Sequence, residues 1–164
     1  MGTRSRIGIM HGDKVKSIYC NWDGYLEHNG QILQKHYNSA RANMLVALGD
    51  MSSLGPVLGQ AHPFSQFDIN EDDPEREAKL ALMELVKVEG WCTFYGRDRG
   101  EADTEWKVAN TFEEFLEQAD LCGAEYYYIM KDGVWYCGTT YDTGSLSRRL
   151  VLLSEALESV KEQA

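Results

Sequence analysis

The sequence predicts an α+β fold in which helices pack against an antiparallel sheet built from β-hairpins. Two segments, 6–22 and 125–141, are rich in β-branched and aromatic residues, and a glycine-containing turn signal divides each of them. Apolar residues occur at helical spacing in four other segments, 30–49, 74–83, 110–119 and 145–164. Hairpins followed by helices, without a βαβ unit or a dinucleotide-binding glycine motif, are typical of the α+β class.

The spacing of apolar residues changes from alternation to helical spacing, which predicts a first hairpin followed by a first helix. Ile7 and Ile9 alternate with small or polar residues, and His11-Gly12-Asp13 supplies the turn to a second strand. Asp23-Gly24 ends that strand. From residue 30 onward the apolar spacing is helical, and Gly49 is a natural place for this helix to stop.

The middle of the chain is expected to be less regular. Segment 50–68 is rich in glycine and proline and predicts a long irregular connection, with one short helical turn at Met51–Leu54. Pro74 is well placed at a helix start, and the helix is expected to continue to about Met83. A strand is expected from about Gly90.

The C-terminal third carries the clearest local signals. Thr111 and Glu114 have the spacing of a capping box at a helix start. Asp132-Gly133 lies between two aromatic runs and predicts a tight hairpin turn. Ser145 is expected to cap a final amphipathic helix.

Composition limits the classes of function. The 164 residues suit one α+β domain spanning 1–164, with a possible helical insertion around 72–88. The formal net charge is −10, so we expect no direct nucleic-acid binding, although an acidic surface can also mimic a nucleic acid. No apolar run approaches the roughly 20 residues of a membrane span, so no membrane association is expected. We expect a cytoplasmic protein.

The cysteines and histidines give no sign of a metal or cofactor site. The four cysteines include no C-x-x-C pair and are expected to be free thiols. The histidines do not have metal-ligand spacing, and no nucleophile motif is present. No catalytic residue, metal or cofactor is therefore assigned.

Arg4 and Arg6 form the first candidate site. Side chains alternate along a strand, so the two guanidinium groups should point the same way and could hold a phosphate or carboxylate. The alternative is a solvated sheet edge on which these arginines pair with the abundant acidic residues.

The bend "NWDGY" is the second candidate. Asn21, Trp22, Asp23 and Tyr25 bring stacking surface and hydrogen-bonding groups to one turn, which could hold a base or another ring. The alternative is a structural corner, with Trp22 in the core, Asp23 capping the turn and Gly24 at positive φ. Because a hairpin brings its two ends together, this bend should lie beside the first strand's arginines.

The segment "FYGRDRGEADTEW" is the third candidate. Tyr95, Arg97, Asp98 and Arg99 follow an aromatic strand, and flanking glycines would let backbone amides approach an anion. The alternative is a charged turn whose acidic and basic groups satisfy each other. Together, the candidate ligand-binding residues are Arg4, Arg6, Asn21, Trp22, Asp23, Tyr25, Tyr95, Arg97, Asp98 and Arg99.

Several of these motifs, in this order, resemble a family of small, mostly uncharacterised proteins of tailed bacteriophages. The motifs are "GTRSRI", "IYCNWDGYLEHNG", "LGDMSSLG", "FYGRDRGE" and "KDGVWY", and they cover most of the chain from Gly2 to Tyr136. Segment 72–88 looks like extra helical material relative to shorter relatives. The resemblance implies a viral accessory protein that counters host defence, either by covering a host enzyme or by sequestering a nucleotide messenger.

The function expected from these observations is non-enzymatic binding of a host factor or an anionic, nucleotide-like ligand. One alternative is an enzyme acting on a nucleotide or phosphate ester, with Arg97 and Arg99 on phosphate and Asp98, Asp23 or His28 in acid–base roles. A further alternative is an acidic nucleic-acid mimic. A homo-oligomer is also possible, because the aromatic hairpin 125–141 could form an interface as easily as a core.

Overall fold

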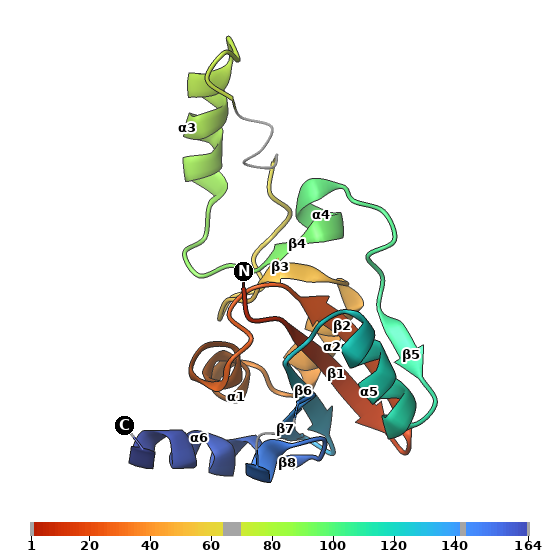
Figure 1. Cartoon of the computed structure of the whole chain (residues 1–164). Coiled ribbons are helices and arrows are strands. Elements are labelled where there is room, and N and C mark those ends of the chain that lie inside the picture. The colour runs from red at the N-terminus through yellow and green to blue at the C-terminus, as the bar shows by residue number, and fades with distance from the viewer. Residues whose placement is uncertain (1, 64–69, 142–143, 164) are drawn as a thin grey trace.

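The computed structural model describes residues 2–63, 70–141 and 144–163. An eight-stranded sheet runs through the molecule with helices packed around it, so the α+β prediction is confirmed (Figure 1). In the described part of the chain, no helix is both long and apolar enough to span a membrane.

Both predicted hairpins are present. Strands β1 (Ser5–His11) and β2 (Lys14–Cys20) pair antiparallel around a turn in which Gly12 has a φ of 60°. Strands β6 (Tyr126–Lys131) and β7 (Val134–Thr139) pair around Asp132-Gly133, whose φ values of 51° and 80° explain why this dipeptide occupies the turn. In this second hairpin Tyr127, Tyr128 and Trp135 are buried in the core, whereas Tyr126 and Tyr136 are half-buried.

The sheet is mixed, and the prediction of a purely antiparallel sheet is wrong. Strand β1 pairs with β6 in parallel, and β2 pairs in parallel with β3 (Met51–Ser53). Local alternation predicts each hairpin but carries no information about which strand of one hairpin lies beside which strand of the other. The strand order is β4-β3-β2-β1-β6-β7-β8, with β5 also pairing with β2; the remaining strands are β4 (Thr93–Phe94), β5 (Lys107–Ala109) and β8 (Val151–Leu152).

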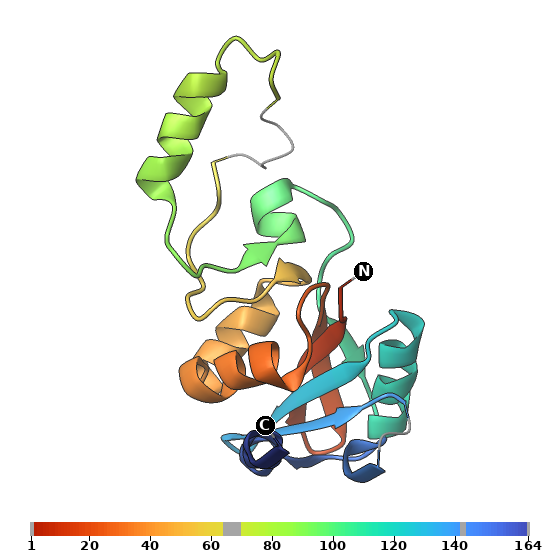
Figure 2. The same ribbon diagram turned by 60° about the vertical axis from the view of Figure 1, so that its left-hand side comes forward.

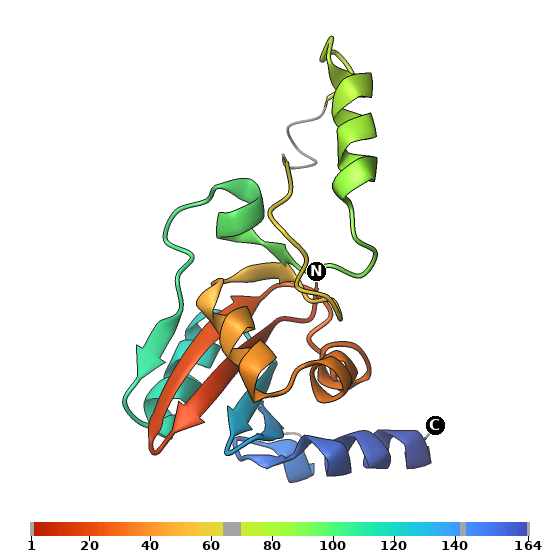
Figure 3. The same cartoon turned by 180° about the vertical axis from the view of Figure 1, so that it is seen from behind.

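Helices cover both faces of the sheet. Helices α1 (Gln31–His36), α2 (Ser39–Ala47) and α6 (Leu153–Gln163) lie on one face, and α5 (Phe112–Leu121) lies on the other (Figure 3). The core is correspondingly divided into two clusters of buried apolar side chains. The predicted cap of α5 is confirmed, because Glu114 N donates to Thr111 Oγ1 over 3.1 Å.

The helix predicted over 30–49 is interrupted. A single π-helical turn (Leu26–Gly30) leads into α1, and the chain is extended at Tyr37 before α2 begins. Trp135 Nε1 donates to the Tyr37 carbonyl over 2.8 Å, and the Asn38 side chain accepts from Arg41 N to cap α2. A tertiary hydrogen bond and a local cap thus satisfy groups that a continuous helix would have paired. The predicted stop at Gly49 is confirmed by its φ of 92°.

Two further local predictions are wrong. Residues 51–54 form strand β3 and its continuation instead of a helical turn, because Asn21 N and Trp22 N donate to Met51 O and Ser52 O. The last helix starts at Leu153 instead of Ser145, because the preceding chain first pairs with β7 as strand β8.

Helix α3 (Arg76–Val86) stands away from the sheet on two connecting stretches (Figures 1 and 2). It extends three residues beyond the predicted end, and none of its side chains is buried. The stretches leading into and out of the arm meet at a β-bridge between Val57 and Trp91. That 72–88 is an insertion stays a prediction.

Candidate functional site

A cavity of about 400 Å³ lies where strands β3 and β4 meet the foot of α3. Short helix α4 (Tyr95–Arg99) forms one wall, and the segment before residue 64 forms another. Its volume is within the range of small-molecule sites. The aromatic lining consists of Trp22, Trp91 and His62, and hydroxyl groups come from Ser52, Ser53 and Thr93.

The backbone around the "NWDGY" bend holds Trp22 at the edge of this cavity. Trp22 N donates to Ser52 O over 3.0 Å, and Trp22 O accepts from the Asn29 amide. One side of the indole lies against Gly2, where a Cβ would be only 2.5 Å from the ring. Trp22 itself is 45% exposed, so the alternative that placed it in the core is wrong. An exposed, fixed indole is a suitable surface for stacking a ring.

Asp23 and Gly24 have other roles in this turn than those predicted for a structural corner. The positive φ falls on Asp23, at 55°, and not on Gly24. Gly24 is needed for close approach, since a Cβ there would lie 2.7 Å from the Cβ of Ser5. The Asp23 carboxylate raises the pKa of Tyr25, and neither residue lines the cavity.

Asp98 and Arg97 form a buried ion pair that ties α4 to the chain around it. Arg97 Nε donates to Asp98 Oδ1 over 2.8 Å, and Arg97 Nη2 donates to Oδ2 over 3.1 Å. The same guanidinium also donates to Leu58 O and Cys92 O. Its donors are therefore engaged within the chain, which favours the self-satisfied turn over direct anion binding by Arg97.

His62 is hydrogen-bonded to Asp98 of the Asp98–Arg97 ion pair. Its backbone N donates to Asp98 Oδ1 over 3.0 Å, and its ring stacks on Trp91 with centroids 3.7 Å apart. Nε2 lies 3.6 Å from Asp98 Oδ2 and has no hydrogen-bond partner in the described part of the chain. Burial lowers the pKa of His62, and the nearby Asp98 carboxylate opposes that shift.

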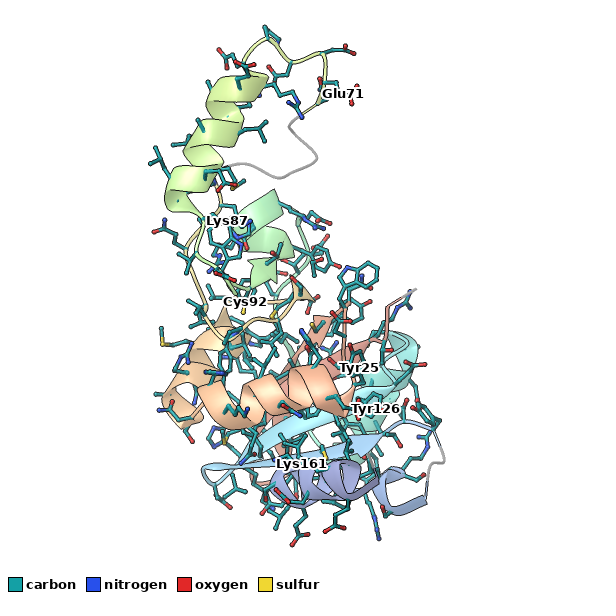
Figure 4. All side chains as sticks on the ribbon, turned by 90° about the vertical axis from the view of Figure 1, so that its left-hand side faces the viewer. Tyr25, Glu71, Lys87, Cys92, Tyr126 and Lys161 are labelled. Atoms are coloured by element: carbon teal, nitrogen blue, oxygen red, sulfur yellow. The ribbon has the colours of Figure 1, made fainter. Side chains whose placement is uncertain are left out.

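Two cations reach the cavity from different elements. Lys87, just beyond α3, lies at the foot of the helix close to α4, while Arg99 comes from α4 itself (Figure 4). Arg99 also lies over the ring of Tyr95, 5.3 Å from its centroid. Glu84 supplies an acidic group on the α3 side. Burial raises the pKa of Tyr95, against a hydrogen bond with Ser52.

Arg6 of β1 and Arg4, just before that strand, lie away from this cavity. Arg6 is only 2% exposed and donates to Ser17 Oγ and Ser17 O on the neighbouring strand. Arg4 lies against Gly123 after α5. Both guanidinium groups lie near the end of α5, since Arg6 Nη1 is 3.9 Å from Cys122 Sγ, but neither lines the cavity, and Arg6 is not on a solvated edge. Asn21 is also outside it, accepting a hydrogen bond from the Tyr19 hydroxyl.

Of the predicted site residues, Trp22, Asp98 and Arg99 are therefore brought together. Sequence reasoning missed His62, Trp91 and Lys87, together with the hydroxyl groups and the α3 residues. The position of His62 in a long loop rich in glycine and proline was a usable signal, because such loops often carry function. Nothing local indicated that Lys87 would face this loop.

The described histidine, cysteine and carboxylate side chains do not suggest a metal centre. No group of three histidine, cysteine, aspartate or glutamate side chains could hold an ion within residues 2–63, 70–141 and 144–163. Comparisons with protein-family models, curated proteins and solved structures found no match to this chain.

Proposed function

We propose that the protein is a non-enzymatic binding protein that takes a small, anionic, nucleotide-like ligand in this cavity. The observation that carries the proposal is the meeting of Trp22, Lys87 and Arg99 around one opening of about 400 Å³. An indole stacks on the ring of a ligand, and two cations attract its phosphate.

The Asp98 carboxylate is fully engaged within the protein, which favours ligand binding over catalysis. The Asp98 side chain is completely buried, and both carboxylate oxygens already accept hydrogen bonds from Arg97 and from backbone amides. A carboxylate that is fully engaged within the protein is a poor general base. The resemblance to tailed-phage proteins suggests a setting in which sequestering such a ligand would counter host defence.

The test is thermal unfolding against a panel of mononucleotides, cyclic oligonucleotides and NAD-derived molecules. A specific ligand at 100 times its Kd should add about 2.7 kcal/mol to the free energy of unfolding. Trp22→Ala should abolish the shift. Trp106→Ala is the matched control, because Trp106 is similarly exposed, at 40%, but lies under Lys16 away from the cavity lining.

Two results would count against the proposal. A panel without any shift would reject the small-ligand site and direct attention to a host protein. A ligand recovered by mass spectrometry as a converted product would favour the enzyme alternative, whereas recovery of the intact molecule supports sequestration.

A further inference from the structure

Among the described side chains that line the cavity, His62 carries a buried ring nitrogen, Nε2, without a hydrogen-bond partner. Its side chain is 9% exposed, and Nε2 has no partner in the part of the chain that the structure describes. Stacking on Trp91 at an interplanar angle of 19° holds the imidazole in place. Buried polar atoms in folded proteins are nearly always paired, so this nitrogen requires an explanation.

Asp98 does not satisfy Nε2. Oδ1 accepts from His62 N and Arg97 Nε, and Oδ2 accepts from Phe94 N and Arg97 Nη2, over 2.7 to 3.1 Å. The separation of 3.6 Å between Nε2 and Oδ2 is too long for a hydrogen bond. Among residues 2–63, 70–141 and 144–163, no group therefore pairs with Nε2, which is available to a ligand that enters the cavity.

The cavity has a buried end around the His62 imidazole and an exposed end around Lys87 and Trp22. Burial lowers the pKa of His62, which favours the neutral imidazole. Lys87 is exposed and Arg99 is half-buried, and Trp22 lies at an exposed edge. A phosphate placed at the inner end would lose its hydration beside the Asp98 carboxylate, which is costly. At the outer end it would stay hydrated next to Lys87.

We propose that a nucleotide-like ligand enters with the hydrogen-bonding edge of its base against His62 Nε2 and leaves its phosphate at the mouth beside Lys87. This inference rests on the proposed function and adds the orientation of the ligand and the residue that reads its base. His62 is then the specificity contact, and Lys87 contributes affinity without distinguishing one base from another.

The experiment compares the four common nucleoside 5′-monophosphates with the corresponding nucleosides by isothermal titration calorimetry. His62→Phe keeps a stacking ring on Trp91 and removes the nitrogen, so it tests the hydrogen bond without removing the packing. Lys87→Met keeps the stem and removes the charge. Lys161→Ala is a matched control, because this exposed lysine lies on α6 at the opposite end of the molecule (Figure 4).

The orientation predicts a specific pattern. His62→Phe should weaken the preferred nucleotide and its nucleoside by the same factor, about 5- to 10-fold, as expected for one hydrogen bond. Lys87→Met should weaken the nucleotide by about 5-fold or more and leave the nucleoside unchanged. Thermal unfolding of each variant checks that it is folded.

The opposite pattern would overturn the inference while keeping the proposed function. If His62→Phe weakens only the phosphorylated ligand, the phosphate lies at the inner end. If His62→Phe weakens neither the nucleotide nor the nucleoside, water and not the ligand satisfies Nε2. If the wild-type protein binds none of these nucleotides or nucleosides, the proposed orientation is rejected. The proposed function is then decided separately by the cyclic oligonucleotides and NAD-derived molecules of the thermal-unfolding panel.

Discussion

The Asp98 carboxylate should be the most sensitive polar group of the candidate site. Its side chain is completely buried, and it accepts hydrogen bonds from the Arg97 guanidinium, from Phe94 N and from His62 N. Asp98→Ala leaves both backbone amides without an acceptor and Arg97, 13% exposed, without its counter-charge. Removing one partner of a buried pair costs about 3–5 kcal/mol. Because Arg97 keeps two backbone acceptors, Leu58 O and Cys92 O, we expect about 3 kcal/mol.

The assay is urea unfolding and thermal unfolding, each monitored by tryptophan fluorescence and circular dichroism, with hydrogen exchange to locate the change. A loss of this size should lower the Tm by roughly 6–12 °C in a chain of this length. Exchange should rise first in the amides at positions 62 and 94. Asp120→Ala is the control, because Asp120 pairs with Arg148 over 3.3 Å on the surface and should contribute at most about 1 kcal/mol. Equal losses from the two variants would refute the argument that burial makes the Asp98 pair important.

Three further predictions concern stability and thiol chemistry. Thr111→Ala removes the hydroxyl that caps α5 and should lower the free energy of unfolding in urea by about 1 kcal/mol; no measurable change would mean that the cap is dispensable. Gly24→Ala would place a Cβ 2.7 Å from that of Ser5 and should cost about 1–3 kcal/mol in the same assay, whereas a neutral effect would show that the two segments can separate. Burial raises the pKa of Cys20 and of Cys137 to about 12 from an ordinary 9.0, so at pH 9 iodoacetamide should modify them only after unfolding, as read by mass spectrometry. Because the thiols have the lower pKa in the unfolded chain, that chain releases these protons first, and the free energy of unfolding should fall as the pH rises above about 9. Equally fast iodoacetamide labelling of the folded and the unfolded protein would contradict the burial argument.

Local chemistry was enough to predict the two hairpins and some of the helix ends. The Asp132-Gly133 turn, the Thr111 cap and the stop at Gly49 each depend on residues adjacent in sequence, and each is present. The same reasoning predicted a helical turn at 51–54, where pairing with β2 imposes a strand instead. Short apolar segments have no decisive period of their own, so their neighbours determine their conformation.

The candidate site was predictable in part. Residues with an unusual combination of chemistry, such as Trp22 at a bend and Arg99 after an aromatic strand, drew attention correctly to one edge of the sheet. Arg6 carries the same charge as Arg99 and was equally plausible, yet it is buried against Ser17. Alternation along a strand predicts that two side chains share a face, but it does not predict what covers that face.

The sequence by itself determined the α+β class, the two hairpins and the ends of several elements, because these depend on contacts within a few residues. Only the tertiary structure decided that β1 lies parallel to β6 and that His62, Asp98 and Lys87 meet around one cavity. These residues are separated by long stretches of chain, and their meeting depends on how the sheet, α4 and the α3 arm pack together. That arrangement follows from burial and hydrogen bonding across the whole molecule, which no local pattern encodes.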